Sequence, residues 1–321
     1  MRQLVFILIT TVHPFLLASC QPDLAPEIVP DYPPAEQSID IPGDSHASQP
    51  GVSGVTENVV ESFYYEEIMS VKKISSAQGG DCWGDYFFQF MTNNGSIRVF
   101  DLALKTQVQT IYIPESQQGF VSNCHSNTAC FGTEYFAPED LFPLIYVSTG
   151  YAADGYTGAL VYRITQDAQG RFSVSLVQTI RFPKMYSSWT EFIPAGEYAY
   201  LCYPNDLVIY QVKMPKLSDG DVIIDPKSAS KKTCRFPPQP DWLSSSRNQD
   251  RLFNNGRIMF LTGVPQSGEF SGLVILNLEK GSRESILDFT KNGLTSEPES
   301  LFIWQGDLCV AFKDRIVKLF L

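Results

Sequence analysis

The chain has 321 residues, which is enough for one large domain or two of ordinary size. Hydrophobic residues make up 44% of it and aromatic residues 13%, as suits a well-packed β protein. The formal net charge of −11 argues against nucleic acid as a partner, because phosphate binding needs clustered lysines and arginines.

The first 20 residues have the pattern of an export signal. Arg2 precedes a mostly apolar run, 4–17, which is short for a membrane span and ends in small residues. The segment LASC (17–20) resembles the bacterial lipobox, in which cleavage precedes a cysteine that receives diacylglycerol. The resemblance implies a mature chain anchored to the membrane through Cys20. Gln21 in the next position implies retention at the outer membrane, on either face. The alternative is an ordinary signal peptide with a coincidental cysteine.

Residues 21–58 are rich in proline, serine, glycine and acidic residues and show no apolar period. Such a segment cannot bury enough surface to fold, and its prolines keep it extended. We therefore predict three parts: a signal peptide (1–20), a disordered tether (21–58) and a folded domain (59–321). A small ligand-binding arm is the alternative reading of the tether.

The folded part contains five weakly similar strand segments. In each, a Gly or Asp comes just before or at the start of an aliphatic run that usually carries a late aromatic residue. The segments are NGSIRVFDL (94–102), GALVYRI (158–164), DLVIYQV (206–212), SGLVILNL (271–278) and DRIVKLFL (314–321). Segments that recur in this way are typical of a radial repeat, so we predict an all-β fold, a five-bladed β-propeller.

Apolar runs and turn residues divide the domain into blades of up to four strands. Blade one spans 78–114 and blade two spans 125–183. Blade three starts at WTEFIP (189–194) and ends in a poor outer strand near VIID (222–225), followed by a polar excursion, 226–245. Blades four and five fill the remainder, from 248 to 321.

The last blade is one strand short, while residues 60–74 form an apolar and aromatic strand with no blade of its own. Pairing the two closes the ring and removes two exposed sheet edges. This count of strands favours five blades, because six or seven would need strands that the chain does not contain. No long amphipathic helix is present, which argues against a parallel α/β fold.

Six cysteines follow Cys20, and three of them (Cys130, Cys202 and Cys309) lie in apolar strand runs. We expect these three to be buried apolar residues. No CxxC motif or Cys/His spacing indicates a metal site, and we predict no cofactor.

Polar residues occur at the start of every innermost strand, where all blades face one end of the channel. They are Gln78 and Asp81, His125 and Asn127, Trp189 and Glu191, Gln249 and Asp250, and Glu297 and Glu299. We predict a ligand site at this channel mouth, with Trp189 as a stacking platform. The alternative is a polar lining that serves a water-filled channel and satisfies backbone groups.

Two functions fit these residues. The first is a binding or scaffold module that holds a glycan, a peptide or a protein at the channel mouth. The second is a glycan hydrolase that uses inner-strand carboxylates, for which Asp81, Glu191, Asp250 and Glu299 are candidates. No nucleophile elbow, phosphate loop or HExxH helix is present.

Three segments carry a family resemblance: QGGDCWGDYFFQF (78–90), HSNTACFGTE (125–134) with FPLIYVS (142–148), and SEPESLFIWQGDLCVAF (296–312). With the lipobox, they resemble uncharacterised propeller lipoproteins of Bacteroidetes-type bacteria. The third segment is also similar to an inner-strand element of carbohydrate- or cell-wall-associated five-bladed propellers, often with Gly where this chain has Ser300. The resemblance implies the fold and an envelope location, without a reaction.

Overall fold

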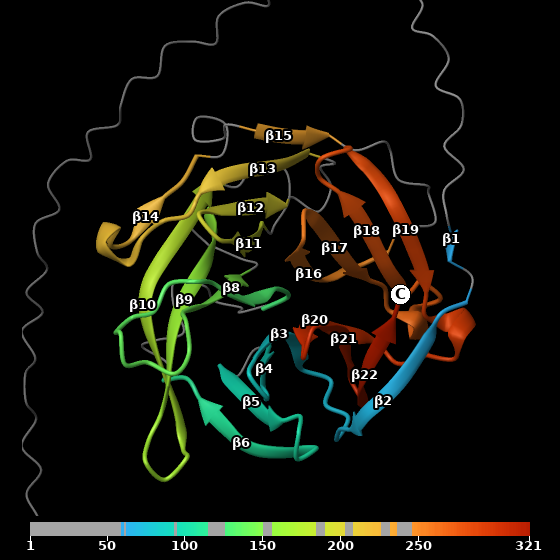
Figure 1. Ribbon diagram of the computed structural model, residues 1–321, viewed down its shortest axis with the longest axis horizontal. Coiled ribbons are helices and arrows are strands. Elements are labelled where there is room, and N and C mark those ends of the chain that lie inside the picture. Colours follow the sequence, from blue (N-terminus) through green and yellow to red (C-terminus); the bar gives the residue numbers. More distant parts are fainter. Residues whose placement is uncertain are drawn as a thin grey trace, which may run out of the picture. The chain divides into compact units, whose positions relative to one another are not determined.

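The computed structural model describes residues 59–60, 62–92, 95–114, 126–149, 156–183, 190–202, 208–225, 232–235 and 246–321. Their strands form five sheets of four or five strands around a central axis (Figure 1). The predicted five-bladed β-propeller is therefore confirmed. In these ranges the helices are three single 3₁₀ turns, η2 (Leu217–Asp219), η3 (Pro265–Ser267) and η4 (Thr290–Asn292). None of the described helices has the length and hydropathy needed to cross a membrane.

Blades one and two follow the predicted order from the axis to the rim. Blade one contains β3 (Ala77–Trp83), β4 (Tyr86–Met91), β5 (Ser96–Asp101) and β6 (Thr106–Tyr112). Blade two contains β7 (Ala129–Phe131), β8 (Ile145–Thr149), β9 (Tyr156–Gln166), β10 (Phe172–Pro183) and an added strand, β14 (Val222–Ile223).

Blade three corrects one prediction. It contains β11 (Glu191–Ala195), β12 (Tyr198–Cys202), β13 (Val208–Lys213) and β15 (Lys232–Arg235). The VIID segment is not its outer strand, because β14 crosses to blade two and pairs in parallel with β10. The outer strand lies instead inside the stretch predicted to be a polar excursion. An outer strand pairs on one side only, so a polar sequence such as KTCR is tolerated there and gives little signal.

Blades four and five complete the ring. Blade four contains β16 (Asn248–Asn254), β17 (Arg257–Thr262), β18 (Gly272–Asn277), β19 (Ser282–Asp288) and, in parallel with β19, β1 (Val59–Val60). Blade five contains β20 (Pro298–Trp304), β21 (Asp307–Phe312), β22 (Arg315–Phe320) and β2 (Tyr64–Ser70).

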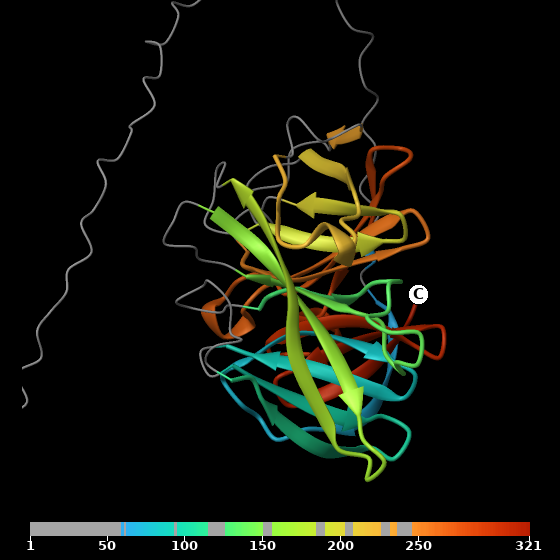
Figure 2. The same cartoon turned by 90° about the vertical axis from the view of Figure 1, so that its left-hand side faces the viewer.

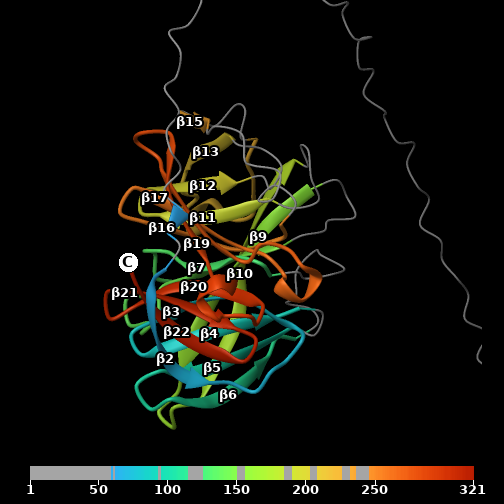
Figure 3. The same cartoon turned by 90° about the vertical axis from the view of Figure 1, so that its right-hand side faces the viewer.

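The ring closes as predicted. Strand β2 pairs antiparallel with the last strand, β22, from Tyr64 opposite Phe320 to Ser70 opposite Arg315 (Figure 3). A bulge after Glu67 allows the consecutive residues Ile68 and Met69 both to be buried. The single strand predicted over 60–74 is in fact two strands, because β1 first joins the edge of blade four.

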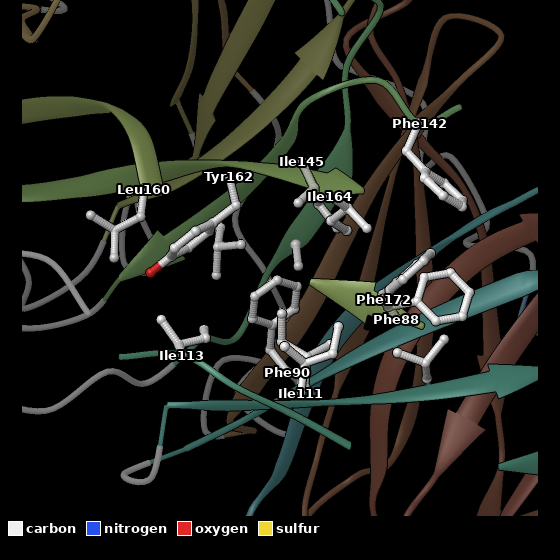
Figure 4. Packing of buried hydrophobic residues seen from close by; sticks show 14 residues of the cluster. Phe88, Phe90, Ile111, Ile113, Phe142, Ile145, Leu160, Tyr162, Ile164 and Phe172 are labelled. Carbon is white, nitrogen blue, oxygen red and sulfur yellow. The ribbon is translucent and has the colours of Figure 1, made fainter. Parts of the chain in front are cut away.

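The core consists of five hydrophobic clusters, each between two neighbouring blades. Figure 4 shows the cluster between blades one and two, where Phe88 and Phe90 face Phe142, Tyr162 and Phe172. The neighbouring residue Phe87 points to the other face of its sheet and packs in the cluster with blade five. Each sheet is therefore covered on both faces, which explains why its strands read as continuous apolar runs.

An aromatic pair lies in each of these five interfaces. The pairs, with the distance between ring centroids, are Phe88–Phe142 (5.4 Å), Tyr146–Phe192 (5.6 Å), Tyr200–Phe253 (5.1 Å), Phe289–Phe312 (5.4 Å) and Phe87–Phe302 (4.4 Å). Such contacts add to the free energy gained by burying the rings.

The β9–β10 hairpin is longer than the other strands of the ring and extends along the rim of blade one (Figure 2). The Gln109 side chain of β6 binds the backbone of Phe172 twice, with Nε2 donating to the carbonyl at 2.7 Å and Oε1 accepting the N–H at 2.8 Å. This contact ties the two blades together at the rim.

Candidate functional site

Asp81, on the innermost strand of blade one, links two blades. Its Oδ1 accepts the backbone N–H of Cys82 at 2.7 Å, and its Oδ2 accepts that of Phe131, in blade two, at 2.7 Å. An innermost strand has a free edge, so its backbone groups need partners from elsewhere. Burial raises the pKa of the Asp81 carboxyl from 3.8 to about 7, although both N–H donors act to lower it.

Asp250 makes the same arrangement between blades four and five. Its Oδ1 accepts the N–H of Arg251 at 2.7 Å, and its Oδ2 accepts the N–H of Leu301 at 2.8 Å. Burial raises the pKa of this carboxyl well above its usual range, and the nearby charges of Asp81 and Glu191 raise it further. The two aspartates therefore link neighbouring blades through equivalent pairs of hydrogen bonds.

Other side chains link the remaining neighbours at the axis. Between blades two and three, Ser148 Oγ accepts the N–H of Phe192 at 2.8 Å. Between blades five and one, Ser300 Oγ donates to the carbonyl of Gln78 at 2.8 Å. Each link satisfies a backbone group on the free edge of an innermost strand.

Between blades three and four the link is an ion pair. Arg251 Nε lies 2.9 Å from Glu191 Oε2, and both side chains are almost fully buried. The guanidinium also donates to the carbonyl of Asp250 at 3.0 Å and lies 4.0 Å from the centroid of the Phe260 ring. Burial raises the pKa of Glu191, while the charge of Arg251 lowers it. Removing one partner would leave an uncompensated buried charge.

Contacts across the axis show that the channel is narrow. Cys130 Sγ, in blade two, donates to the carbonyl of Arg251, in blade four, at 3.4 Å. Asn127 Nδ2 likewise donates across to the carbonyl of Asn248 at 3.4 Å. We call Asp81, Cys130, Glu191, Asp250 and Arg251 the axial cluster, and all five side chains are buried.

The mouth lies where the innermost strands begin. There Gln249 Nε2 donates to Glu297 Oε1 at 3.0 Å, and Lys313 pairs with Glu297 and, at 3.1 Å, with Glu299. Burial raises the pKa of Glu299 well above its usual range, while Lys313 acts to lower it. Only Glu297 of the predicted carboxylates is partly exposed.

Two polar atoms at the mouth lack partners in the described part of the chain. Gln78 Oε1 and Thr128 Oγ1 are buried and accept or donate no hydrogen bond there. A buried polar atom without a partner costs free energy, so each such atom in a native structure requires an explanation.

Seven of the nine predicted mouth residues can be placed. Asp81, Glu191 and Asp250 meet in the axial cluster, whereas Gln78, Asn127, Glu297 and Glu299 lie nearer the mouth. His125, Trp189 and the predicted lipid site Cys20 lie outside the described residues. Cys130, Cys202 and Cys309 are buried and unpaired within the described ranges, as expected.

Sequence reasoning missed Arg251, Lys313 and Ser148. Arg251 carried a signal, since an arginine in an innermost strand, between Asp250 and apolar residues, must find an anionic partner. Lys313 and Ser148 carried none, because a lysine in a turn and a serine in a strand are ordinary surface residues.

The four candidate carboxylates are buried and have internal partners. None of them lines the three hollows defined by described residues. No group of three or more His, Cys, Asp or Glu residues within those ranges is placed to hold a metal ion. The contacts of these carboxylates fit a structural role, in which they hold neighbouring blades of the ring together.

The matches to known proteins are distant. No protein-family model matches the chain, and no curated protein does. Among solved structures, it is similar to glutaminyl cyclase from Myxococcus xanthus, with 13% identity, a TM-score of 0.49, and coverage of 80% of this chain and 95% of that one. It is also similar to the β-propeller domain of Cps50 (Swd1) from Myceliophteria thermophila, with 13% identity, a TM-score of 0.35, and coverage of 76% and 82%. A tail fibre of a Staphylococcus aureus phage follows, with 10% identity, a TM-score of 0.43, and coverage of 81% and 52%. At these identities and TM-scores the likeness carries no functional argument. The five sheets of the chain itself define it as a five-bladed β-propeller protein.

Proposed function

We propose that this protein is a binding or scaffold module of the bacterial cell envelope, held at the outer membrane by lipid on Cys20. The observation that carries the proposal over the hydrolase is the use of the carboxylates. Asp81 and Asp250 each accept two backbone N–H groups, and Glu191 and Glu299 are ion-paired. A glycosidase instead presents two carboxyl groups to an open substrate site.

The ligand, a glycan, peptide or protein, binds at the channel mouth in this proposal. Gln78 Oε1 and Thr128 Oγ1 support this position, because they have no hydrogen-bond partner among the described residues and a bound molecule would supply one. Lys313 and Glu297 add charged groups of both signs nearby. The envelope location rests on the lipobox and the proline-rich segment of the sequence alone.

The mouth can be tested with Thr128→Val. The valine keeps the shape of the side chain and removes a buried hydroxyl that has no partner among the described residues, so stability should be unchanged or slightly higher. Binding of the full chain to glycan and peptide arrays should fall at least about tenfold, the effect of one lost hydrogen bond. Tyr146→Phe is the matched control, because the Tyr146 hydroxyl is also buried without a partner among the described residues but lies in the hydrophobic cluster between blades two and three.

Two outcomes would overturn the proposal. Unchanged array binding by Thr128→Val would remove the mouth as the site. Release of reducing ends from a glycan by the full chain would favour the hydrolase, provided that a folded Glu191→Gln variant loses that activity. Labelled palmitate on the expressed protein, absent in Cys20→Ser, would test the anchor.

A further inference from the structure

The end of the ring opposite the mouth carries a group of exposed aromatic rings. The turns that join the first and second strands of the blades lie there, on the right in Figure 2. Trp83, Tyr135, Phe136 and Tyr198 are 38–43% exposed at this end. Tyr64 and Phe320, which face each other in blade five, also lie at this end, whereas Tyr112 lies at the opposite end of the ring, in β6. We call this end the turn face.

A hollow of about 860 Å³ opens on the turn face between blades two and three. Its lining includes Glu134, Tyr198, Gln211, Lys213, Met214 and Lys216. The volume falls in the range of small-molecule sites and exceeds those of two further hollows on the described residues, of about 680 and 10 Å³.

The walls of the hollow are held in place. Glu134, from the long turn of blade two, accepts the backbone N–H of Leu217 with both carboxylate oxygens, at 3.2 and 3.3 Å. This bond fixes the segment after β13 against blade two. Gln211 Nε2 donates to the Tyr200 hydroxyl at 3.3 Å, which orients the amide. A site whose groups are already oriented loses less entropy on binding.

The polar groups in the hollow that are available to a ligand include both hydrogen-bond donors and hydrogen-bond acceptors. Lys213 and Lys216 are exposed and form no ion pair in the described ranges, although most other described lysines and arginines pair with a carboxylate. They supply N–H donors, and Glu197 and the Gln211 carbonyl supply acceptors. The Tyr198 ring adds an apolar face with a polar tip.

We infer that this hollow binds an oligosaccharide. A pyranose ring has an apolar C–H face that stacks on an aromatic ring, and an edge of hydroxyls that donate and accept hydrogen bonds. In the hollow, the Tyr198 ring matches the apolar face of such a sugar and the mixed donors and acceptors match its hydroxyl edge. The Trp83–Tyr135 pair (6.4 Å between centroids) is not part of the lining but lies on the same face, where Tyr135 directly follows the lining residue Glu134. The hollow is lined by too few aliphatic side chains to anchor a hydrophobic peptide. The site is separate from the channel mouth and does not depend on it.

Affinity gel electrophoresis of the full chain in a neutral glucan, a galactomannan or polygalacturonate tests the inference. At least one polysaccharide should retard the protein, and Tyr198→Ala should weaken that retardation at least about tenfold by removing the stacking ring. Tyr112→Ala, which removes a still more exposed tyrosine from the outer strand β6, should change nothing. Lys213→Gln with Lys216→Gln distinguishes the ligands, because it should weaken binding of polygalacturonate far more than of the neutral polymers.

Each contrary result has a clear meaning. No retardation in any of the three polymers would overturn the inference, as would equal retardation of Tyr198→Ala and Tyr112→Ala. Retardation lost in Thr128→Val but kept in Tyr198→Ala would place the glycan at the channel mouth and overturn the hollow. The reverse pattern would support the hollow and leave the mouth proposal to its own test.

Discussion

At the scale of single residues, the most informative feature is the pair Asp81 and Asp250. A short carboxylate can accept an N–H from its own strand with one oxygen and an N–H from the next blade with the other. The Ser148 hydroxyl likewise accepts one backbone N–H from the next blade, that of Phe192. The polar residues of the innermost strands are thus explained by the free strand edge that they cover.

At pH 4, Asp81→Asn should lower the free energy of unfolding by about 2–3 kcal/mol. The new amide group presents a donor to a backbone N–H, so one buried hydrogen bond is lost and two donors face each other. Urea unfolding followed by tryptophan fluorescence measures the change. Asp167→Asn is the control, because Asp167 Oδ1 also accepts two backbone N–H groups, those of Gln169 and Arg171, but at an exposed turn. Equal losses in the two variants would contradict the argument from burial.

The raised pKa of Asp81 makes its contribution to stability depend on pH. Because the folded-state pKa of about 7 exceeds the ordinary 3.8, the folded protein holds the proton more tightly than the unfolded chain does. The contribution is complete below about pH 4 and is lost as the pH rises through 7, with each unit of pKa difference worth about 1.4 kcal/mol. The difference in unfolding free energy between wild type and Asp81→Asn, measured from pH 4 to 8, should therefore shrink as the pH rises. A difference that grows would show that the two N–H donors outweigh burial.

At the scale of elements, the segment 214–224 shows how a strand can leave its own blade. Gln178, on β10, donates from Nε2 to the carbonyls of Lys216 at 2.9 Å and Gly220 at 2.7 Å. Asp221 Oδ1 accepts the N–H of Thr179 at 2.7 Å. These bonds direct β14 to the rim of blade two, although its sequence follows blade three.

Gln178→Ala should therefore loosen this segment without unfolding the ring. It leaves two carbonyls without their donor, so amide exchange in 216–224 should become faster by about tenfold or more. Hydrogen exchange with mass spectrometry measures the effect. Gln166→Ala removes a single exposed bond, from Nε2 to the Gly170 carbonyl, and serves as the control. Faster exchange throughout all five sheets would contradict a local role for Gln178.

At the scale of the whole domain, stability depends on closure of the ring. Strand β2 covers the edge of β22 and buries Ile68 and Met69 against blades five and one. Every blade is packed on both faces by its neighbours, so an opening at one interface exposes apolar surface on two blades.

Deleting 59–70 should consequently lower the melting temperature by about 10 °C or more and speed exchange in all five sheets. Differential scanning calorimetry and hydrogen exchange measure the two effects. Ile68→Asn, which places a polar group in the same interface, should act in the same direction, and Glu66→Asn, on the exposed face of β2, should be close to neutral. Loss of protection confined to blade five would show that the blades unfold independently.

The amino-acid sequence determined the class of fold, the number of blades and the closure by the amino-terminal strand. These depend on local patterns, namely apolar runs, turns and a missing strand, that exist before any contact forms. It also identified the polar residues of the innermost strands, including Asp81, Glu191 and Asp250, but not what they do.

Only the tertiary structure decided their roles, because a role depends on which backbone edge or charge lies opposite. It paired Glu191 with Arg251, 60 residues further along the chain, and gave each aspartate an N–H from the next blade. It also moved β14 to blade two, since weak outer strands are placed by side-chain contacts and not by their own sequence. The hollow on the turn face is also decided by the tertiary structure alone, because its walls come from two blades that meet only in the folded ring.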